Sequence, residues 1–73
     1  MFTVFESQDQ KQERLNAQVK VMRREGKILD RFDKEIEQGF RTGMFIEWQG
    51  YEYLVRMLNG NVTRIKELWK IAE

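Results

Sequence analysis

The sequence predicts a small α+β domain in which a β-hairpin packs on a C-terminal helix and one or two helices come first. Three observations lead to this prediction. Six of the nine aromatic residues lie between Phe40 and Trp69, which places the core in the C-terminal half. Residues 44–56 are rich in strand-forming side chains. Residues 62–72 carry apolar side chains at helical spacing.

The first predicted helix spans residues 8–24. Ser7 and Gln10 are spaced as a capping box, and Asp9 lies in the first turn, where the helix dipole favours a negative charge. Leu15, Val19 and Met22 follow at intervals of three and four. The segment is otherwise polar, so we expect a marginal helix at the end of a flexible N-terminus.

A second helix is predicted over residues 27–38. Ile28, Phe32, Ile36 and Phe40 recur every four residues, and Gly39 fits the end of a helix. Gly26 separates this segment from the first, because glycine weakens a helix interior. A hairpin that turns at residues 25–26 is the competing interpretation of the preceding segment.

The hairpin is predicted over residues 44–56, with a two-residue turn at residues 49–50. This register places Trp48 opposite Tyr51 and three further pairs behind them: Ile46 with Tyr53, Met44 with Val55, and Glu47 with Glu52. The last pair is mildly repulsive.

The final helix is predicted over residues 62–72, with Asn61 as its N-cap and an apolar stripe that includes Val62, Ile65, Leu68, Trp69 and Ala72. We expect Ile46, Tyr53 and Trp69 in the core.

An all-α alternative remains open for the same C-terminal half. Tyr51, Leu54, Val55 and Leu58 also fit one face of a helix, which Asn59 and Gly60 would end. Together with the final helix, this segment would form a helix-turn-helix.

Composition narrows the function. The 73 residues include no histidine and no cysteine, the side chains most used for proton transfer, nucleophilic attack and metal binding. We therefore expect a non-enzymatic binding protein with no metal, no other cofactor and no small-molecule substrate. The start of the chain lacks a signal-peptide pattern, and no run of 18 apolar residues occurs. These features predict a cytoplasmic protein that does not enter membranes.

The chain is expected to divide into a flexible or marginally helical basic arm, residues 1–26, and a compact domain, residues 27–73. Three groups of residues are predicted to bind a partner. Apolar side chains near the N-terminus, Phe2, Val4 and Phe5, could enter a groove or extend a sheet. A basic stripe of Lys20, Arg23, Arg24 and Lys27 could contact an anionic surface. Two aromatic residues at the hairpin turn, Trp48 and Tyr51, could anchor an interface.

The net charge of +1 is far from that of a dedicated nucleic-acid-binding protein. A local basic surface could nevertheless contact phosphates. The alternative function is therefore a small nucleic-acid-binding protein, using either the basic stripe or a recognition helix that carries Arg64, Lys66 and Lys70.

The whole chain resembles the small phage-encoded proteins that bind bacterial RNA polymerase and act as transcription inhibitors and antiterminators. The resemblance rests on general organisation: an apolar N-terminus, a basic segment over residues 21–27 (VMRREGK) and an aromatic C-terminal region. It implies a large host partner, the polymerase, together with assistance from a host elongation factor and a basic surface near nucleic acid. No motif transfers individual polymerase contacts to this sequence.

Overall fold

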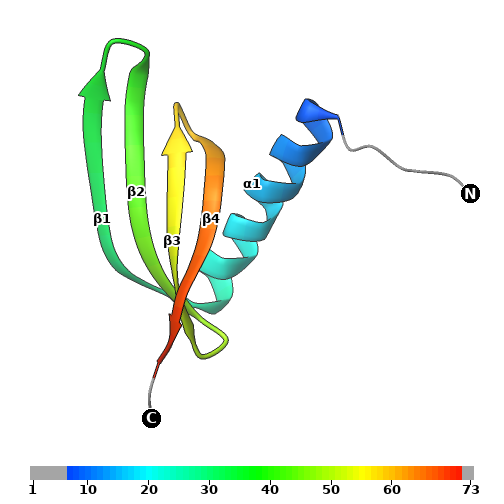
Figure 1. Ribbon diagram of the computed structural model, residues 1–73, viewed down its shortest axis with the longest axis vertical. Coiled ribbons are helices and arrows are strands. Elements are labelled where there is room, and N and C mark those ends of the chain that lie inside the picture. Colours follow the sequence, from blue (N-terminus) through cyan, green and yellow to red (C-terminus); the bar gives the residue numbers. More distant parts are fainter. Residues whose placement is uncertain (1–6, 72–73) are drawn as a thin grey trace, which may run out of the picture.

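The computed structural model describes residues 7–71, which form one helix followed by a four-stranded antiparallel sheet (Figure 1). Helix α1 spans Gln8–Glu25. The strands are β1 (Lys27–Ile36), β2 (Gly39–Trp48), β3 (Tyr51–Leu58) and β4 (Asn61–Lys70), and each pairs with the next along the chain. The predicted hairpin on a C-terminal helix is therefore the wrong fold class. The all-α alternative with a helix-turn-helix is also wrong.

Helix α1 begins where the capping box predicts. The Ser7 hydroxyl accepts the Gln10 backbone N–H at 3.1 Å, and the Gln10 side chain accepts the Ser7 backbone N–H at the same distance. The helix ends at Gly26, whose N–H donates to the Met22 carbonyl. A Cβ at Gly26 would collide with the Glu47 carbonyl oxygen, so glycine lets β2 pass close to the end of the helix.

Strand β1 occupies the segment predicted as a second helix, and that prediction is wrong. Residues four positions apart lie on the same face of a strand as well as on the same face of a helix, so the spacing fits both. In the structure, however, Ile28 does not share a face with Phe32. A register shift between Ile28 and Asp30 leaves Ile28 paired with Ile46 and Phe32 paired with Gly43, on opposite faces of the sheet.

Strands β2 and β3 form the hairpin with the predicted register, which is confirmed for Trp48 with Tyr51, Ile46 with Tyr53, Met44 with Val55 and Glu47 with Glu52. The backbone φ is positive at both central turn residues, +52° at Gln49 and +82° at Gly50, as a type I′ turn requires. The next turn, at Asn59 and Gly60, repeats this geometry with +51° and +83°. It joins two strands, so its predicted role as a helix end is wrong. Gly39 likewise begins β2 instead of ending a helix.

Strand β4 replaces the predicted C-terminal helix, and irregular pairing explains the error. Val62 pairs with Met57, and Ile65 pairs with Val55. The two β4 residues are three positions apart in the sequence, whereas their partners in β3 are two positions apart. The extra residue is a bulge, and it keeps both side chains on the face toward α1. A second shift lies between the pairs Tyr53–Glu67 and Glu52–Trp69. The first insertion gives the three-residue interval from Val62 to Ile65 that resembles a helical stripe.

The hydrophobic core lies between α1 and one face of the sheet. Its buried members are Val19 and Met22 from the helix and Met44, Ile46, Val55 and Val62 from the strands. Tyr53 packs against this cluster, whereas Trp69 is 57% exposed, which corrects its predicted core position. Residues of the predicted N-terminal arm therefore share one core with the sheet.

Polar contacts fasten the same helix to β4. The Gln12 side-chain amide donates to the Val62 carbonyl at 2.7 Å, and the Asn16 side-chain oxygen accepts the Val62 N–H at 2.8 Å. Gln12 also donates to this Asn16 oxygen at 3.1 Å. Both backbone polar groups of Val62, a residue only 1% exposed, thus receive partners from α1.

Candidate functional site

A groove on the helix side of the molecule brings together three of the four predicted stripe cations. Its volume is about 560 Å³. Lys20, Arg23 and Arg24 line it from α1. Apolar side chains of α1, β1, β3 and β4 complete it: Val19, Ile28, Met57 and Val62. No carboxylate is among the described residues that line the groove. We call it the helix-side groove.

The fourth stripe residue, Lys27, lies elsewhere. It begins β1, pairs with Glu47 and lines a separate hollow beside the β2–β3 turn. Of the groove cations, Arg24 has an acidic neighbour at 3.9 Å in Glu25, a pair in which both side chains are largely exposed. A pair of this kind contributes little and breaks easily. The groove is therefore positively charged where it meets solvent.

The turn aromatics are only partly available for binding. The Trp48 indole N–H donates to a Glu25 carboxylate oxygen at 3.1 Å, and its ring centroid lies 5.9 Å from that of Tyr53. Trp48 also packs against the core cluster, so it links the turn to the end of α1. Burial raises the pKa of Tyr53, and the nearby Glu67 carboxylate adds to this effect. Tyr51 is half-buried and pairs with Trp48 and Lys70.

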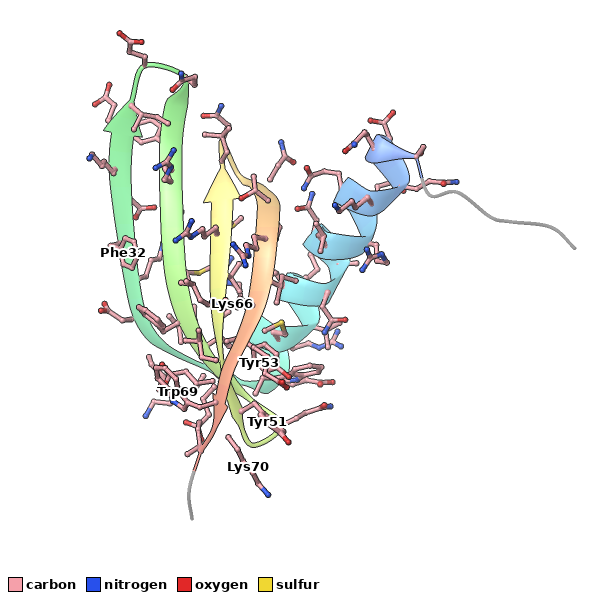
Figure 2. The ribbon with its side chains drawn as sticks, in the orientation of Figure 1. Phe32, Tyr51, Tyr53, Lys66, Trp69 and Lys70 are labelled. Carbon is pink, nitrogen blue, oxygen red and sulfur yellow. The ribbon has the colours of Figure 1, made fainter. Side chains whose placement is uncertain are left out.

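The opposite face of the sheet, which α1 does not cover, also has hollows lined by basic and apolar side chains. Strand alternation places Phe32, Phe45 and Leu54 together there, around a hollow of about 450 Å³. Phe32 and Phe45 lie with ring centroids 6.3 Å apart. We call this surface the open face, and Figure 2 shows it from Phe32 on β1 to Lys66 on β4.

The predicted nucleic-acid residues are divided by this arrangement. Arg64 and Lys66 line a second hollow on the open face with Arg56, Leu54 and Leu68. Lys70 lies at the end of β4, paired with Tyr51. All three are on a strand, so the recognition helix predicted to carry them is wrong.

The open face has no signature in the sequence, because its members come from three or more strands. Phe32, Lys34, Arg41, Phe45, Leu54 and Arg56 were not among the predicted site residues. Asn-Gly at residues 59–60 was the available signal, since this dipeptide strongly favours a two-residue hairpin turn. A strand after it would have placed Arg64 and Lys66 beside β3.

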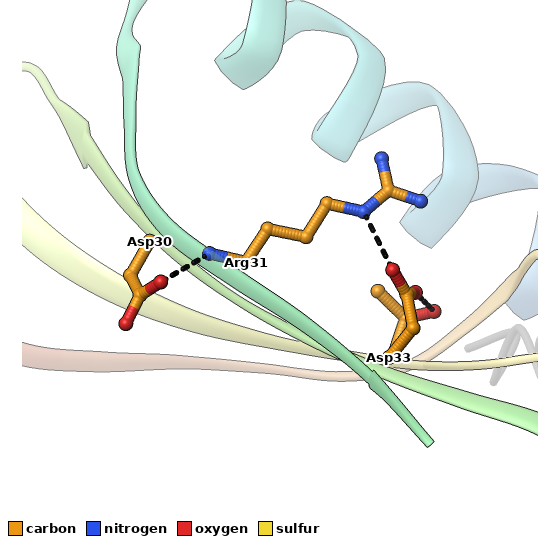
Figure 3. A network of polar contacts seen from close by, with 4 residues as sticks. Asp30, Arg31 and Asp33 are labelled. Atoms are coloured by element: carbon orange, nitrogen blue, oxygen red, sulfur yellow. Dashed lines mark hydrogen bonds and ion pairs between the residues drawn. The ribbon is translucent and has the colours of Figure 1, made fainter. Parts of the chain in front are cut away.

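A small polar network lies on β1 and reaches β2 (Figure 3). Asp30 accepts the Arg31 backbone N–H at 2.8 Å, and the Arg31 guanidinium lies 3.4 Å from Asp33. The Thr42 hydroxyl on β2 donates to Asp33 at 2.6 Å. That hydrogen bond is the main cause that lowers the pKa of Asp33, with Arg31 assisting and partial burial opposing. Arg31 and Asp33 thus satisfy each other within the fold.

The N-terminal group Phe2, Val4 and Phe5 lies outside the described residues. Within residues 7–71, no cluster of acidic side chains is arranged to hold a metal ion. The one helix in that range is too polar to be a membrane-spanning segment.

Comparison with known proteins gives no relative: no family model, no curated protein and no solved structure matches the chain.

Proposed function

We propose that this protein is a non-enzymatic regulatory protein that docks on a large host assembly, with bacterial RNA polymerase as the partner. The helix-side groove is the observation that carries the proposal. It places Lys20, Arg23 and Arg24 on the rim of an apolar floor formed in part by Met57 and Val62. A partner segment with acidic side chains around an apolar anchor fits this chemistry.

The choice of RNA polymerase as the partner rests on the resemblance to small phage-encoded polymerase-binding proteins. The resemblance implies that docking modulates transcription, by inhibition of initiation and by antitermination. Such an effect requires that the protein bind one conformational state of the polymerase more tightly than another, since equal affinity would shift no equilibrium.

The test is capture of purified bacterial RNA polymerase by the full chain, followed by a termination assay with the same preparation. We expect a saturable complex and increased read-through of a terminator. The variant with Lys20→Glu, Arg23→Glu and Arg24→Glu should lose both, because its rim repels an acidic partner. Lys27→Glu is the matched control, since Lys27 belongs to the same basic sequence run but lies outside the groove.

Two results would contradict the proposal. One is the absence of a complex at micromolar concentrations of both proteins. The other is a complex that the triple charge reversal leaves unchanged while circular dichroism shows that this variant is folded. Equal losses for the triple variant and Lys27→Glu would show that net charge, and not the groove, determines binding.

A further inference from the structure

The open face of the sheet carries a second inference, which does not depend on the proposed function. Its centre is aromatic and accessible. Phe32 is 53% exposed, and its ring lies over Gly43, where any Cβ would collide with it. Phe45 stands beside it with a ring tilt of 50°, and Leu54 extends the apolar surface to β3. Glycine at residue 43 therefore keeps a ring flat against the sheet and available on its outer side.

Cations line the hollows beside this centre, whereas the strand register places Asp30, Glu47 and Glu52 on the same face at its other end. Three adjoining hollows share Arg56, and together they are lined by Lys34, Arg41, Arg56, Arg64 and Lys66. The described residues lining these hollows include no aspartate or glutamate. None of the five cations forms an ion pair with another described residue. All five side chains are exposed to solvent.

The strand register makes this charge costly for the free protein. Lys34 lies directly opposite Arg41 across β1 and β2, and Arg56 lies directly opposite Arg64 across β3 and β4. Like charges in directly opposed positions destabilise a sheet. Two such pairs flank the aromatic centre. A bound polyanion would relieve the repulsion in both pairs, so the free energy lost in folding is returned on binding.

We propose that the open face binds single-stranded nucleic acid, with bases on Phe32 and Phe45 and phosphates against the neighbouring cations. Aromatic rings in a positively charged groove are the recurrent means of holding unpaired bases without sequence preference. A duplex hides the faces of its bases, so it would leave both rings unused. An acidic protein would use the cations but has no requirement for exposed stacking surfaces. The combination therefore favours a single strand.

The test is fluorescence anisotropy of the full chain with a labelled single strand of about 12 nucleotides, within the site sizes usual for such surfaces. DNA and RNA strands form two arms of the experiment. Phe32→Ala should weaken binding by about fivefold to 150-fold, the loss expected when one stacked base loses its ring. Phe32→Tyr keeps the stacking surface and should retain binding.

Phe40→Ala is the matched control. Phe40 has nearly the same exposure, 57%, but its place in the β2 alternation puts it on the face opposite Phe45. It should bind as the unmodified chain does. Arg56→Gln should reduce the slope of log affinity against log salt by about 0.7, the value for one phosphate contact on a single strand.

Several outcomes would overturn this inference. They are no binding at micromolar protein, a preference for the duplex of the same sequence, and equal effects of Phe32→Ala and Phe40→Ala. Equal competition by polyglutamate would assign the face to an acidic protein instead. The helix-side triple variant separates the two proposals. It should lose polymerase and keep the oligonucleotide, whereas Phe32→Ala should bind the oligonucleotide about fivefold to 150-fold more weakly and keep polymerase.

Discussion

Asn16 joins helix α1 to the sheet, and its replacement by alanine tests whether this polar junction stabilises the fold. The substitution removes the acceptor of the Val62 N–H, which lies 2.8 Å away in a residue that is 1% exposed. A buried donor left without a partner costs about 1–3 kcal/mol. Alanine also improves helix propensity by at most about 0.7 kcal/mol, which offsets part of the loss. The net decrease expected in the free energy of unfolding is about 0.3–2.3 kcal/mol.

For a domain of this size, a decrease of that magnitude lowers the melting temperature by about 1–18 °C. Urea unfolding followed by circular dichroism gives the free energy directly, and the slope with denaturant should stay constant. Lys11→Ala is the control, because this exposed lysine lies on the same helix and gains the same kind of propensity. An Asn16→Ala protein as stable as the Lys11→Ala protein would refute the reasoning, since the Val62 N–H would then need no partner from α1.

Three further predictions concern the core, the helix end and the β1 network. Met22→Ala should lower the free energy of unfolding by about 2–5 kcal/mol in a urea titration, because the side chain is 1% exposed, whereas Val21→Ala, at a half-buried position, should cost less. Gly26→Ala should destabilise by about 1–3 kcal/mol in the same assay, since its Cβ would press on the Glu47 carbonyl, whereas Gly50→Ala meets open space and should show only the strain of its positive φ. The lowered pKa of Asp33 means that its ionised form stabilises the fold above the usual titration range of aspartate, and this contribution disappears as pH falls through the lowered value. Thr42→Val should move the NMR-measured pKa of Asp33 up toward its ordinary value, whereas Thr63→Val, whose hydroxyl donates only to a backbone carbonyl, should leave it in place.

The parts of the fold that depend on local signals could be predicted from the sequence. The capping box of Ser7 and Gln10 marks the start of α1, and the Gln49–Gly50 turn sets the register of the β2–β3 hairpin. Both are decided by residues close together in the chain. The start of α1 and the register of this hairpin therefore agree with the local sequence preference, and contacts with distant segments do not override it.

The two helix predictions failed because apolar spacing alone is ambiguous. Ile28, Phe32 and Ile36 fit either a helix or a strand, and only pairing with β2 decides between them. In β4, the bulge after Val62 produces a three-residue interval that a regular strand cannot have. Tertiary pairing thus overrides the local pattern in both segments.

The candidate sites follow the same division. Lys20, Arg23 and Arg24 were predictable as a group because helical spacing places them on one face. The groove they line needed Met57 and Val62 from distant strands. The open face could not be foreseen without β1 and β4, since Lys34 and Arg64 reach it from opposite edges of the sheet.

Among the described residues, β1 is an edge strand of the sheet, so the backbone groups on its outer side have no neighbouring strand. Six of its ten residues are charged, and the strand is bulged near its start. These are the devices by which proteins keep a lateral strand from recruiting a second chain. The charged side chains of residues 27–36 therefore oppose edge-to-edge pairing of β1 with a second chain. Replacing them with neutral residues should make the protein prone to aggregation.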